Sequence, residues 1–299
     1  MCGAARYAHR VTADLTVPPY ETRRLPTARG SFAVVDVPAA PGSDAKGTAL
    51  LLPGYTGSKE DFTLLHGPLA ARGYRSVAVD GRGQHESDGP DDESAYALDE
   101  LARDVLAQVA ALGERVHLVG HSLGGLIARR AVLLDHSPFR SLTLMASGPA
   151  RISVSQEQRV RLLRDALAVM SMEECWRAIL AMGPPEEVGG PARGIGGPEL
   201  LRRRWLRTRP AQLLATGRQL CTEPDLVDRL AAVPLPFHVL SGSRDDTWPV
   251  ADLDAMARRL NAHRSVIEGA EHSPNADRPE ETARALADFW DGIEPSAGG

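Results

Sequence analysis

The chain has 299 residues, a formal net charge of −5 and a pI near 6.0. This length suits one large domain with an insertion, and the mildly acidic balance gives no electrostatic reason to expect a nucleic acid or an anionic membrane as a partner. No run of about 20 apolar residues is found, so we expect no transmembrane helix.

The three cysteines, Cys2, Cys175 and Cys221, have neither the spacing of a zinc site nor the even count of a disulfide framework. We expect free thiols in a reducing compartment. No apolar stretch precedes Cys2, and basic residues follow it, so no secretory signal is expected and we predict a cytoplasmic location.

The first predicted elements are two short apolar runs, Ser31 to Val37 and Thr48 to Leu52, on either side of a Pro/Gly/Asp turn. We expect them to form a hairpin that feeds a buried strand. Strand-length runs then recur at Arg75 to Val79, Arg115 to Val119, Ser141 to Met145, Pro236 to Leu240 and Arg264 to Ile267.

Amphipathic helices are predicted between these strands, with apolar residues at steps of three and four from Leu98 to Leu112 and from Leu253 to Leu260. Strands that alternate with helices favour an α/β fold, with a mostly parallel sheet covered on both faces. The active site is then expected at the carboxyl ends of the strands.

The segment from Pro149 to Pro234 is too long for a crossover. Helical pieces are expected around Val160 to Met182 and Leu200 to Leu220, joined by a mobile Gly/Pro-rich loop from Gly183 to Pro198. We therefore predict a core domain in two parts, residues 1–148 and 235–293, a helical lid at 149–234, and a disordered tail at 294–299.

The strand Arg115 to Val119 leads directly into Gly120-His121-Ser122-Leu123-Gly124, which is a G-x-S-x-G sequence before an apolar helix-length segment. Such a turn strains the serine backbone and lifts the hydroxyl clear of the sheet, and side chains at the glycine positions would collide with it. We predict that Ser122 is a nucleophile, against the alternative of an incidental serine in a Gly-rich turn.

A serine hydroxyl needs a base within hydrogen-bond reach and a third group that orients the base. His272 follows the last predicted strand, and Asp245 follows the strand before it. We predict a Ser122, Asp245, His272 triad, preferring Asp245 to its neighbour Asp246; the alternative for His272 is an ordinary surface histidine, and His121 is interpreted as structural.

The oxyanion of the reaction needs two backbone N–H donors. We expect one from Leu123, at the start of a helix, and one from Tyr55, in the glycine-bearing loop after Leu52. Tyr55 could also simply line the pocket, and the two interpretations are compatible.

These motifs resemble the α/β-hydrolase superfamily over nearly the whole chain outside the insertion. Asp80 to Ser87 is similar to its D-x-R-G-x-G-x-S loop, and Gly242 to Pro249 is similar to its acid loop. Three positions depart from the family pattern: Pro53 replaces a frequent His, His85 replaces a loop Gly, and Glu271 puts a carboxylate beside His272.

The favoured function is a carboxylic ester hydrolase, or a relative acting on thioesters or lipid-type esters, with a small-molecule substrate. The alternatives are a cofactor-free perhydrolase or carbon–carbon bond hydrolase on the same triad, and a hydrolase-fold binding protein with little turnover. No cofactor and no metal are expected, because the triad needs none and no ligand cluster is apparent.

Arginines outnumber acids in the insertion. They could form a solvated outer face, or one or two could point inward and hold a carboxylate or phosphate of the substrate. The residues concerned are Arg151, Arg159, Arg161, Arg164, Arg177, Arg193, Arg202, Arg203, Arg204, Arg207, Arg209 and Arg218.

Overall fold

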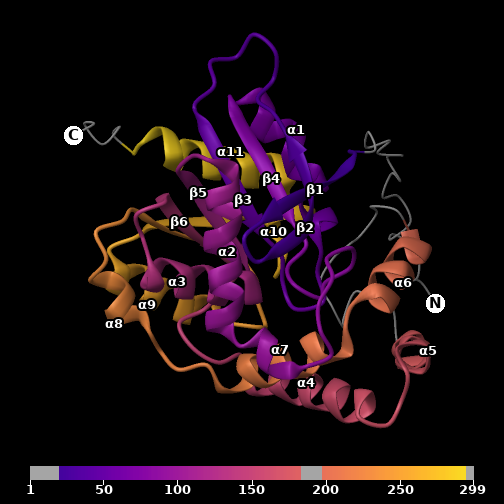
Figure 1. Cartoon of the computed structure of the whole chain (residues 1–299). Coiled ribbons are helices and arrows are strands. Elements are labelled where there is room, and N and C mark those ends of the chain that lie inside the picture. Colours follow the sequence, from indigo (N-terminus) through magenta and orange to yellow (C-terminus); the bar gives the residue numbers. More distant parts are fainter. Residues whose placement is uncertain (1–19, 183–196, 294–299) are drawn as a thin grey trace, which may run out of the picture.

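The computed structural model describes residues 20–182 and 197–293. The predicted tail at 294–299 and most of the predicted Gly/Pro-rich loop lie outside these residues. In the described part of the chain, one eight-stranded sheet has the order β1-β2-β4-β3-β5-β6-β7-β8 (Figure 1). Its strands are β1 Thr22–Thr27, β2 Gly30–Val37, β3 Gly47–Leu52, β4 Tyr74–Val79, β5 Val116–His121, β6 Phe139–Met145, β7 Phe237–Gly242 and β8 His263–Ile267.

The strands from β4 to β8 in the sheet order are parallel, whereas β1 pairs antiparallel with β2 and β2 pairs antiparallel with β4. The predicted hairpin between Ser31–Val37 and Thr48–Leu52 is therefore wrong. β3 lies between β4 and β5, because its all-apolar run is buried on both faces, as an inner parallel strand requires. The true hairpin partner of β2 is β1, an edge strand that tolerates Pro26.

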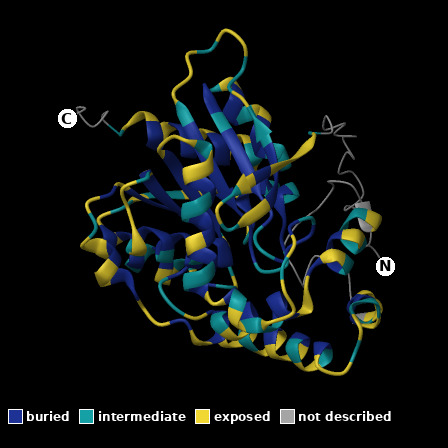
Figure 2. Ribbon diagram, viewed as in Figure 1, coloured by how far each residue is buried: buried dark blue, intermediate teal, exposed yellow. Residues whose placement is uncertain are grey.

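Helices cover both faces of the sheet, as predicted. One apolar cluster joins the sheet to α2 Leu98–Leu112, α3 Leu123–Leu134 and α9 Val250–Leu260. A second cluster on the other face joins it to α1 Thr63–Ala71 and α11 Pro279–Asp291. Figure 2 shows the inner strands buried between these layers, whereas the edge strand β1 is mostly exposed and α11 keeps an exposed outer stripe.

The insertion, residues 149–234, lies between β6 and β7. Its helices are α4 Val154–Leu167, α5 Met172–Met182, α6 Gly197–Arg207, α7 Pro210–Thr222 and α8 Val227–Ala231. The two predicted helical pieces are each divided. The first piece is divided because Ser171 and Glu174 cap the start of a new helix, α5. The second is divided because Pro210 starts a new helix, α7. α4 to α7 gather at one end of the sheet (Figure 1).

The remaining elements are short. They are η1 Lys59–Phe62, η2 Glu93–Tyr96 and α10 Pro274–Asp277. η1 directly follows the loop after β3, and α10 directly follows the loop after β8, so both lie beside the segments predicted to hold Tyr55 and His272.

Candidate active site

Ser122 occupies the sharp turn between β5 and α3. Its backbone has φ 53° and ψ −119°, a left-handed conformation that a non-glycine residue adopts only when the surroundings enforce it. The surroundings here are a buried strand on one side and a buried helix on the other. The hydroxyl is thereby presented at the carboxyl end of the sheet.

The glycines around Ser122 are required by close packing. A Cβ on Gly120 would lie 2.3 Å from the carbonyl oxygen of Gly124, and a Cβ on Gly124 would lie 2.4 Å from the carbonyl oxygen of Leu52. No side chain fits at such distances. The close packing of β3, β5 and α3 beside the serine therefore requires both glycines of the G-x-S-x-G motif.

The structure brings together the three residues of the predicted triad. The Nε2 of His272 lies 3.1 Å from the Oγ of Ser122, and its Nδ1 lies 3.0 Å from both carboxylate oxygens of Asp245. Because a carboxylate only accepts hydrogen bonds, Nδ1 of His272 carries the proton and Nε2 is free to accept from Ser122. This is the arrangement in which an imidazole can act as a base toward a hydroxyl.

Asp245 and Asp246 have opposite environments. The Asp245 side chain is fully buried, and its Oδ1 accepts from the backbone N–H of Thr247 at 2.8 Å. Asp246 points toward the insertion, where its Oδ2 accepts from the amide of Gln156 at 2.7 Å, and its side chain is 67% exposed. Only Asp245 contacts the imidazole of His272.

The two other polar residues beside His272 have roles away from the reaction. His121 donates from Nε2 to the carbonyl oxygen of His272 at 2.9 Å, and burial together with the neighbouring His272 lowers the pKa of His121 to about 4. A neutral His121 thus fixes the backbone of the His272 loop. Glu271 pairs with Arg244 at 3.0 Å on the surface, so its charge is compensated there.

The loop after β3 runs alongside Ser122. A Cβ on Gly54 would lie 3.4 Å from the Cβ of Ser122, so the backbone at Gly54 and Tyr55 is close to the nucleophile. Leu123, the residue after Ser122, is the first residue of α3. The two predicted donors of the oxyanion site therefore flank Ser122 on different segments.

The side chain of Tyr55 points toward the insertion. Its hydroxyl donates to the carbonyl oxygen of Leu213 in α7 at 2.8 Å, and burial raises its pKa above the usual value, so it stays protonated. The aromatic ring packs against apolar residues of both the core and the insertion. Tyr55 thus connects the loop beside Ser122 to α7.

We expect Tyr55→Phe to keep kcat within about threefold of the wild type, because Phe preserves the backbone N–H. The lost hydrogen bond to Leu213 should lower the free energy of unfolding by about 1 kcal/mol. Ester turnover and urea unfolding measure the two effects. A loss of about 10² in kcat would instead show that the hydroxyl takes part in the reaction.

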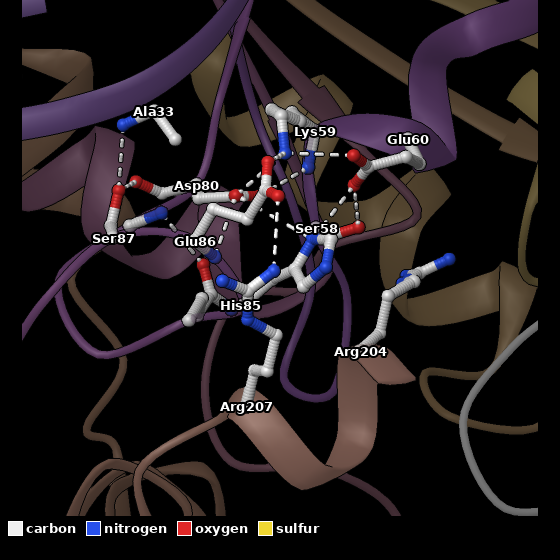
Figure 3. Close-up of polar contacts among 12 residues, drawn as sticks. Ala33, Ser58, Lys59, Glu60, Asp80, His85, Glu86, Ser87, Arg204 and Arg207 are labelled. Carbon is white, nitrogen blue, oxygen red and sulfur yellow. Dashed lines mark hydrogen bonds and ion pairs between the residues drawn. The ribbon is translucent and has the colours of Figure 1, made fainter. Parts of the chain in front are cut away.

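The loop from Asp80 to Ser87 is held by a buried ion network (Figure 3). The ammonium of Lys59 is fully buried and lies 2.7 Å from Glu60, 2.9 Å from Asp80 and 2.8 Å from Glu86. Burial lowers the pKa of Lys59, but the attraction of Asp80 and Glu60 more than offsets this and raises it overall. Lys59 is therefore a permanent internal cation that ties η1 to this loop.

Ligand atoms of Glu60, Asp80 and His85 lie within 4.8 Å of one another, close enough to hold a metal ion. No metal site was predicted from the sequence at these residues. The ammonium of Lys59 contacts both carboxylates, so part of the negative charge that a cation would neutralise is already compensated. The donor set fits an ion network better than a metal centre.

We expect Lys59→Met to lower the free energy of unfolding by about 3 kcal/mol or more, because Glu60 and Asp80 would lose the buried cation between them. The matched control is Lys46→Met, at the chain's other lysine, which forms a half-exposed pair with Asp291. That change should cost less than about 1 kcal/mol. Equal urea midpoints for the two variants would contradict the assigned role of Lys59.

Most of the insertion's arginines pair with acids of the chain. Arg204 is almost fully buried and pairs with Asp61, while Arg203 and Arg207 pair with Glu86 at 3.4 and 3.2 Å, from α6 to the core (Figure 3). Further pairs join Arg161 to Glu157, Arg202 to Glu173, Arg209 to Asp91 and Arg218 to Glu93. Arg193 lies outside the described residues.

These pairs favour the outer-face interpretation for the arginines that form them. Arg204 does point inward, but it meets a carboxylate of the chain itself.

Among the helices in residues 20–182 and 197–293, none has the length and hydropathy of a membrane-spanning segment.

Comparison with known proteins gives three findings. A model of the alpha/beta hydrolase family matches residues 49–285. A pimeloyl-[acyl-carrier protein] methyl ester esterase of Aeromonas hydrophila subsp. hydrophila is 31% identical over 258 residues, covering 78% of this chain and 96% of the relative. A non-heme haloperoxidase of Rhodococcus erythropolis is 31% identical over 231 residues, covering 70% of this chain and 80% of the relative.

Among solved structures, an esterase from Thermogutta terrifontis superimposes with a TM-score of 0.70 at 21% identity. The match covers 92% of this chain and all of the esterase. At this identity the likeness concerns the fold, and it agrees with the sheet order and the helical layers described above.

Proposed function

Because this chain belongs to the alpha/beta hydrolase family, we propose that it is a serine hydrolase that cleaves a carboxylic ester bond of a small organic or lipid-type substrate. The observation that carries the proposal is the hydrogen-bonded series of Ser122, His272 and Asp245 at a strained turn. The name of the 31% identical methyl ester esterase supports the same bond type.

In the proposed reaction, the Oγ of Ser122 attacks the ester carbonyl while Nε2 of His272 takes its proton. Asp245 holds the imidazole in the required tautomer. The developing oxyanion accepts hydrogen bonds from the backbone N–H groups of Tyr55 and Leu123. His272 then returns its proton to the leaving alcohol, and an acyl group remains on Ser122 until a water, activated by His272, releases the carboxylic acid.

The insertion, residues 149–234, is proposed to act as a lid over this site. α7 reaches the loop beside Ser122 through the contact between Tyr55 and Leu213, and Arg204 in α6 pairs with Asp61 close to that loop. The substrate would enter between these helices and the carboxyl ends of the strands. Selectivity for the acyl and alcohol groups would then depend on the lid.

The test of the proposed function is covalent labelling with a fluorophosphonate, followed by a series of p-nitrophenyl esters of increasing chain length. We expect one label per chain, on Ser122 as identified by peptide mass, and burst kinetics with the esters. Labelling elsewhere, or none, would contradict the proposal.

A second candidate is a perhydrolase, in which hydrogen peroxide rather than water takes the acyl group from Ser122 and forms a peracid. The 31% identical relative that is named a non-heme haloperoxidase favours this candidate. Bromination of a dye in the presence of acetate, bromide and hydrogen peroxide would detect it. Loss of this activity in Ser122→Ala would place both reactions on one acyl-enzyme.

The pairing of the insertion's arginines leads to an expectation about substrate charge. Arg203, Arg204 and Arg207 already hold carboxylates of the chain. We therefore expect an ester with a free carboxylate and its methyl-capped analogue to have kcat/KM values within about threefold at low ionic strength. A strong preference for the anionic ester that salt weakens would mean that an arginine binds substrate.

A further inference from the structure

Gln84 connects the loop from Asp80 to Ser87 with the loop beside Ser122. Its Nε2 donates to the carbonyl oxygen of Gly54 at 2.9 Å, and its Oε1 accepts from the backbone N–H of Gly81 at 3.0 Å. A carbonyl can only accept and a backbone N–H can only donate, so the orientation of this amide is fixed by its partners. Gln84 is 5% exposed, its hydrogen bond to Gly54 is buried, and the one from Gly81 is partly buried.

The carbonyl of Gly54 and the N–H of Tyr55 belong to the same peptide unit. The described residues contain no cis peptide bond, so these two groups point in opposite directions. A donor that holds the Gly54 carbonyl on one side therefore directs the Tyr55 N–H to the other side. The backbone N–H of Gly57 also points at the Gly54 carbonyl, at the longer distance of 3.3 Å.

This peptide unit needs such a restraint. Gly54 has no Cβ, so rotation of the peptide between Gly54 and Tyr55 meets little steric resistance from its first residue. A Cβ at that position would lie 3.4 Å from both Ser122 and His121, which is ordinary van der Waals contact, so packing does not force a glycine here. The glycine leaves this peptide with little steric restraint, and the hydrogen bond from Gln84 supplies one.

Gln84 is itself rigidly held. Its backbone N–H donates to the carbonyl of Gly81, and its own carbonyl accepts from Ser87 at 2.8 Å. On either side, Asp80 and Glu86 contact the buried ammonium of Lys59 (Figure 3). The network around Lys59 thereby fixes the loop from which the Gln84 amide extends.

We propose that Gln84 is a positioning residue for the oxyanion site: it holds the Gly54–Tyr55 peptide with the Tyr55 N–H toward the carbonyl oxygen attacked by Ser122. This inference rests on the proposed function, in which that N–H is an oxyanion donor. The hydrogen bond from Tyr55 strengthens as negative charge develops on the substrate oxygen. Loss of Gln84 should therefore lower kcat and leave KM nearly unchanged.

Gln108 in α2 offers a matched control. Gln84 and Gln108 both line a cavity of about 30 Å³ behind Ser122, together with Pro53 and Leu123. Gln108 is equally buried, but among the described residues no hydrogen bond joins it to the loop at 53–57. A Gln→Met change there removes an amide from the same cavity without touching the oxyanion loop.

The experiment compares wild type, Gln84→Met, Gln84→Glu and Gln108→Met on a soluble p-nitrophenyl ester and with phenylboronic acid, which forms a tetrahedral adduct with a nucleophilic serine. Gln84→Glu keeps the acceptor for Gly81 and loses the donor toward Gly54 only when the glutamate is ionised, so its kcat is measured up to the highest pH at which the wild type is active. We expect both Gln84 variants to lose about 10- to 100-fold in kcat, with KM within about threefold and the boronate Ki raised by a similar factor to the kcat loss.

Gln108→Met should keep kcat and the boronate Ki near the wild-type values. If Gln84→Met and Gln84→Glu also keep kcat and the boronate Ki within about threefold, Gln84 does not position the oxyanion site. If Gln84→Glu keeps kcat over that whole pH range while Gln84→Met loses it, the acceptor for Gly81 is what matters and the proposal is wrong. Fluorophosphonate labelling separates failure of the proposed function from failure of this inference. If the wild type is not labelled on Ser122, both are wrong. If it is labelled, the kinetic comparison tests the role of Gln84 alone.

Discussion

Ser122→Ala should lose at least about 10³ in kcat on any ester that the wild type turns over, while its thermal unfolding temperature stays close to the wild-type value. The hydroxyl is the attacking group, and Ala has the same Cβ as Ser in the strained turn. A variant that keeps more than about a tenth of wild-type kcat would show that Ser122 is not the nucleophile.

Ser147→Ala is the matched control for this change. Ser147 is also buried, its side chain packs against the turn near Gly125, and its hydroxyl has no hydrogen-bond partner among the described residues. It should keep wild-type kcat.

His272→Ala should lower kcat by a factor similar to that of Ser122→Ala, and the double variant should lower it little further, because a nucleophile and its base act as a unit. Additive losses would contradict the hydrogen-bonded arrangement of the two residues.

The elements around this site could be predicted because their signals are local. β5 is a short, fully buried strand, α2 has apolar residues at helical spacing, and the strand, Gly-x-Ser-x-Gly turn and helix follow one another directly. Parallel topology then places the ends of β5, β7 and β8 at one edge of the sheet. The proximity of Ser122, Asp245 and His272 follows from that topology.

Strand partners were not predictable in the same way. β1, with the sequence TRRLPT, is mostly exposed and contains a proline, so it lacks the alternation that marks a half-buried strand. β2 and β3 are neighbours in the sequence, yet β4 lies between them in the sheet. Sequence adjacency favours a hairpin, but burial of β3 on both faces favours an inner parallel position, and burial prevails.

The ion network around Lys59 depends on tertiary contacts and leaves no sequence pattern. Lys59 lies in η1 after β3, whereas Asp80 and Glu86 lie in the loop after β4, and the pairing of β3 with β4 brings the two segments together. A single lysine after a loop is typical of a solvated surface. The sequence contains one hint: Lys59 is one of only two lysines in an arginine-rich chain. That rarity marks the residue as unusual but does not predict that it is buried.

The environment of Asp245 leads to the second large expected effect, a loss of about 10³- to 10⁴-fold in kcat for Asp245→Asn. The backbone N–H groups of Thr247 and Trp248 point at Oδ1 of Asp245 at 2.8 and 3.3 Å. These two donors would keep the oxygen of an asparagine on their side. The NH₂ group would then replace Oδ2, 3.0 Å from Nδ1 of His272, and Nδ1 would keep only the Oδ1 that it already shares with the two backbone donors.

An NH₂ group can only donate, so it would favour the tautomer of His272 in which Nδ1 is unprotonated and Nε2 carries the proton. That proton would point at the Oγ of Ser122, and the imidazole could no longer accept the proton of the hydroxyl. Asp246→Asn is the control: its side chain is 67% exposed and contacts Gln156 in α4, so kcat should stay within about threefold. Measuring kcat for the two variants on the same ester decides between the neighbouring carboxylates. A larger loss in Asp246→Asn than in Asp245→Asn would show that Asp246, and not Asp245, is the acid of the triad.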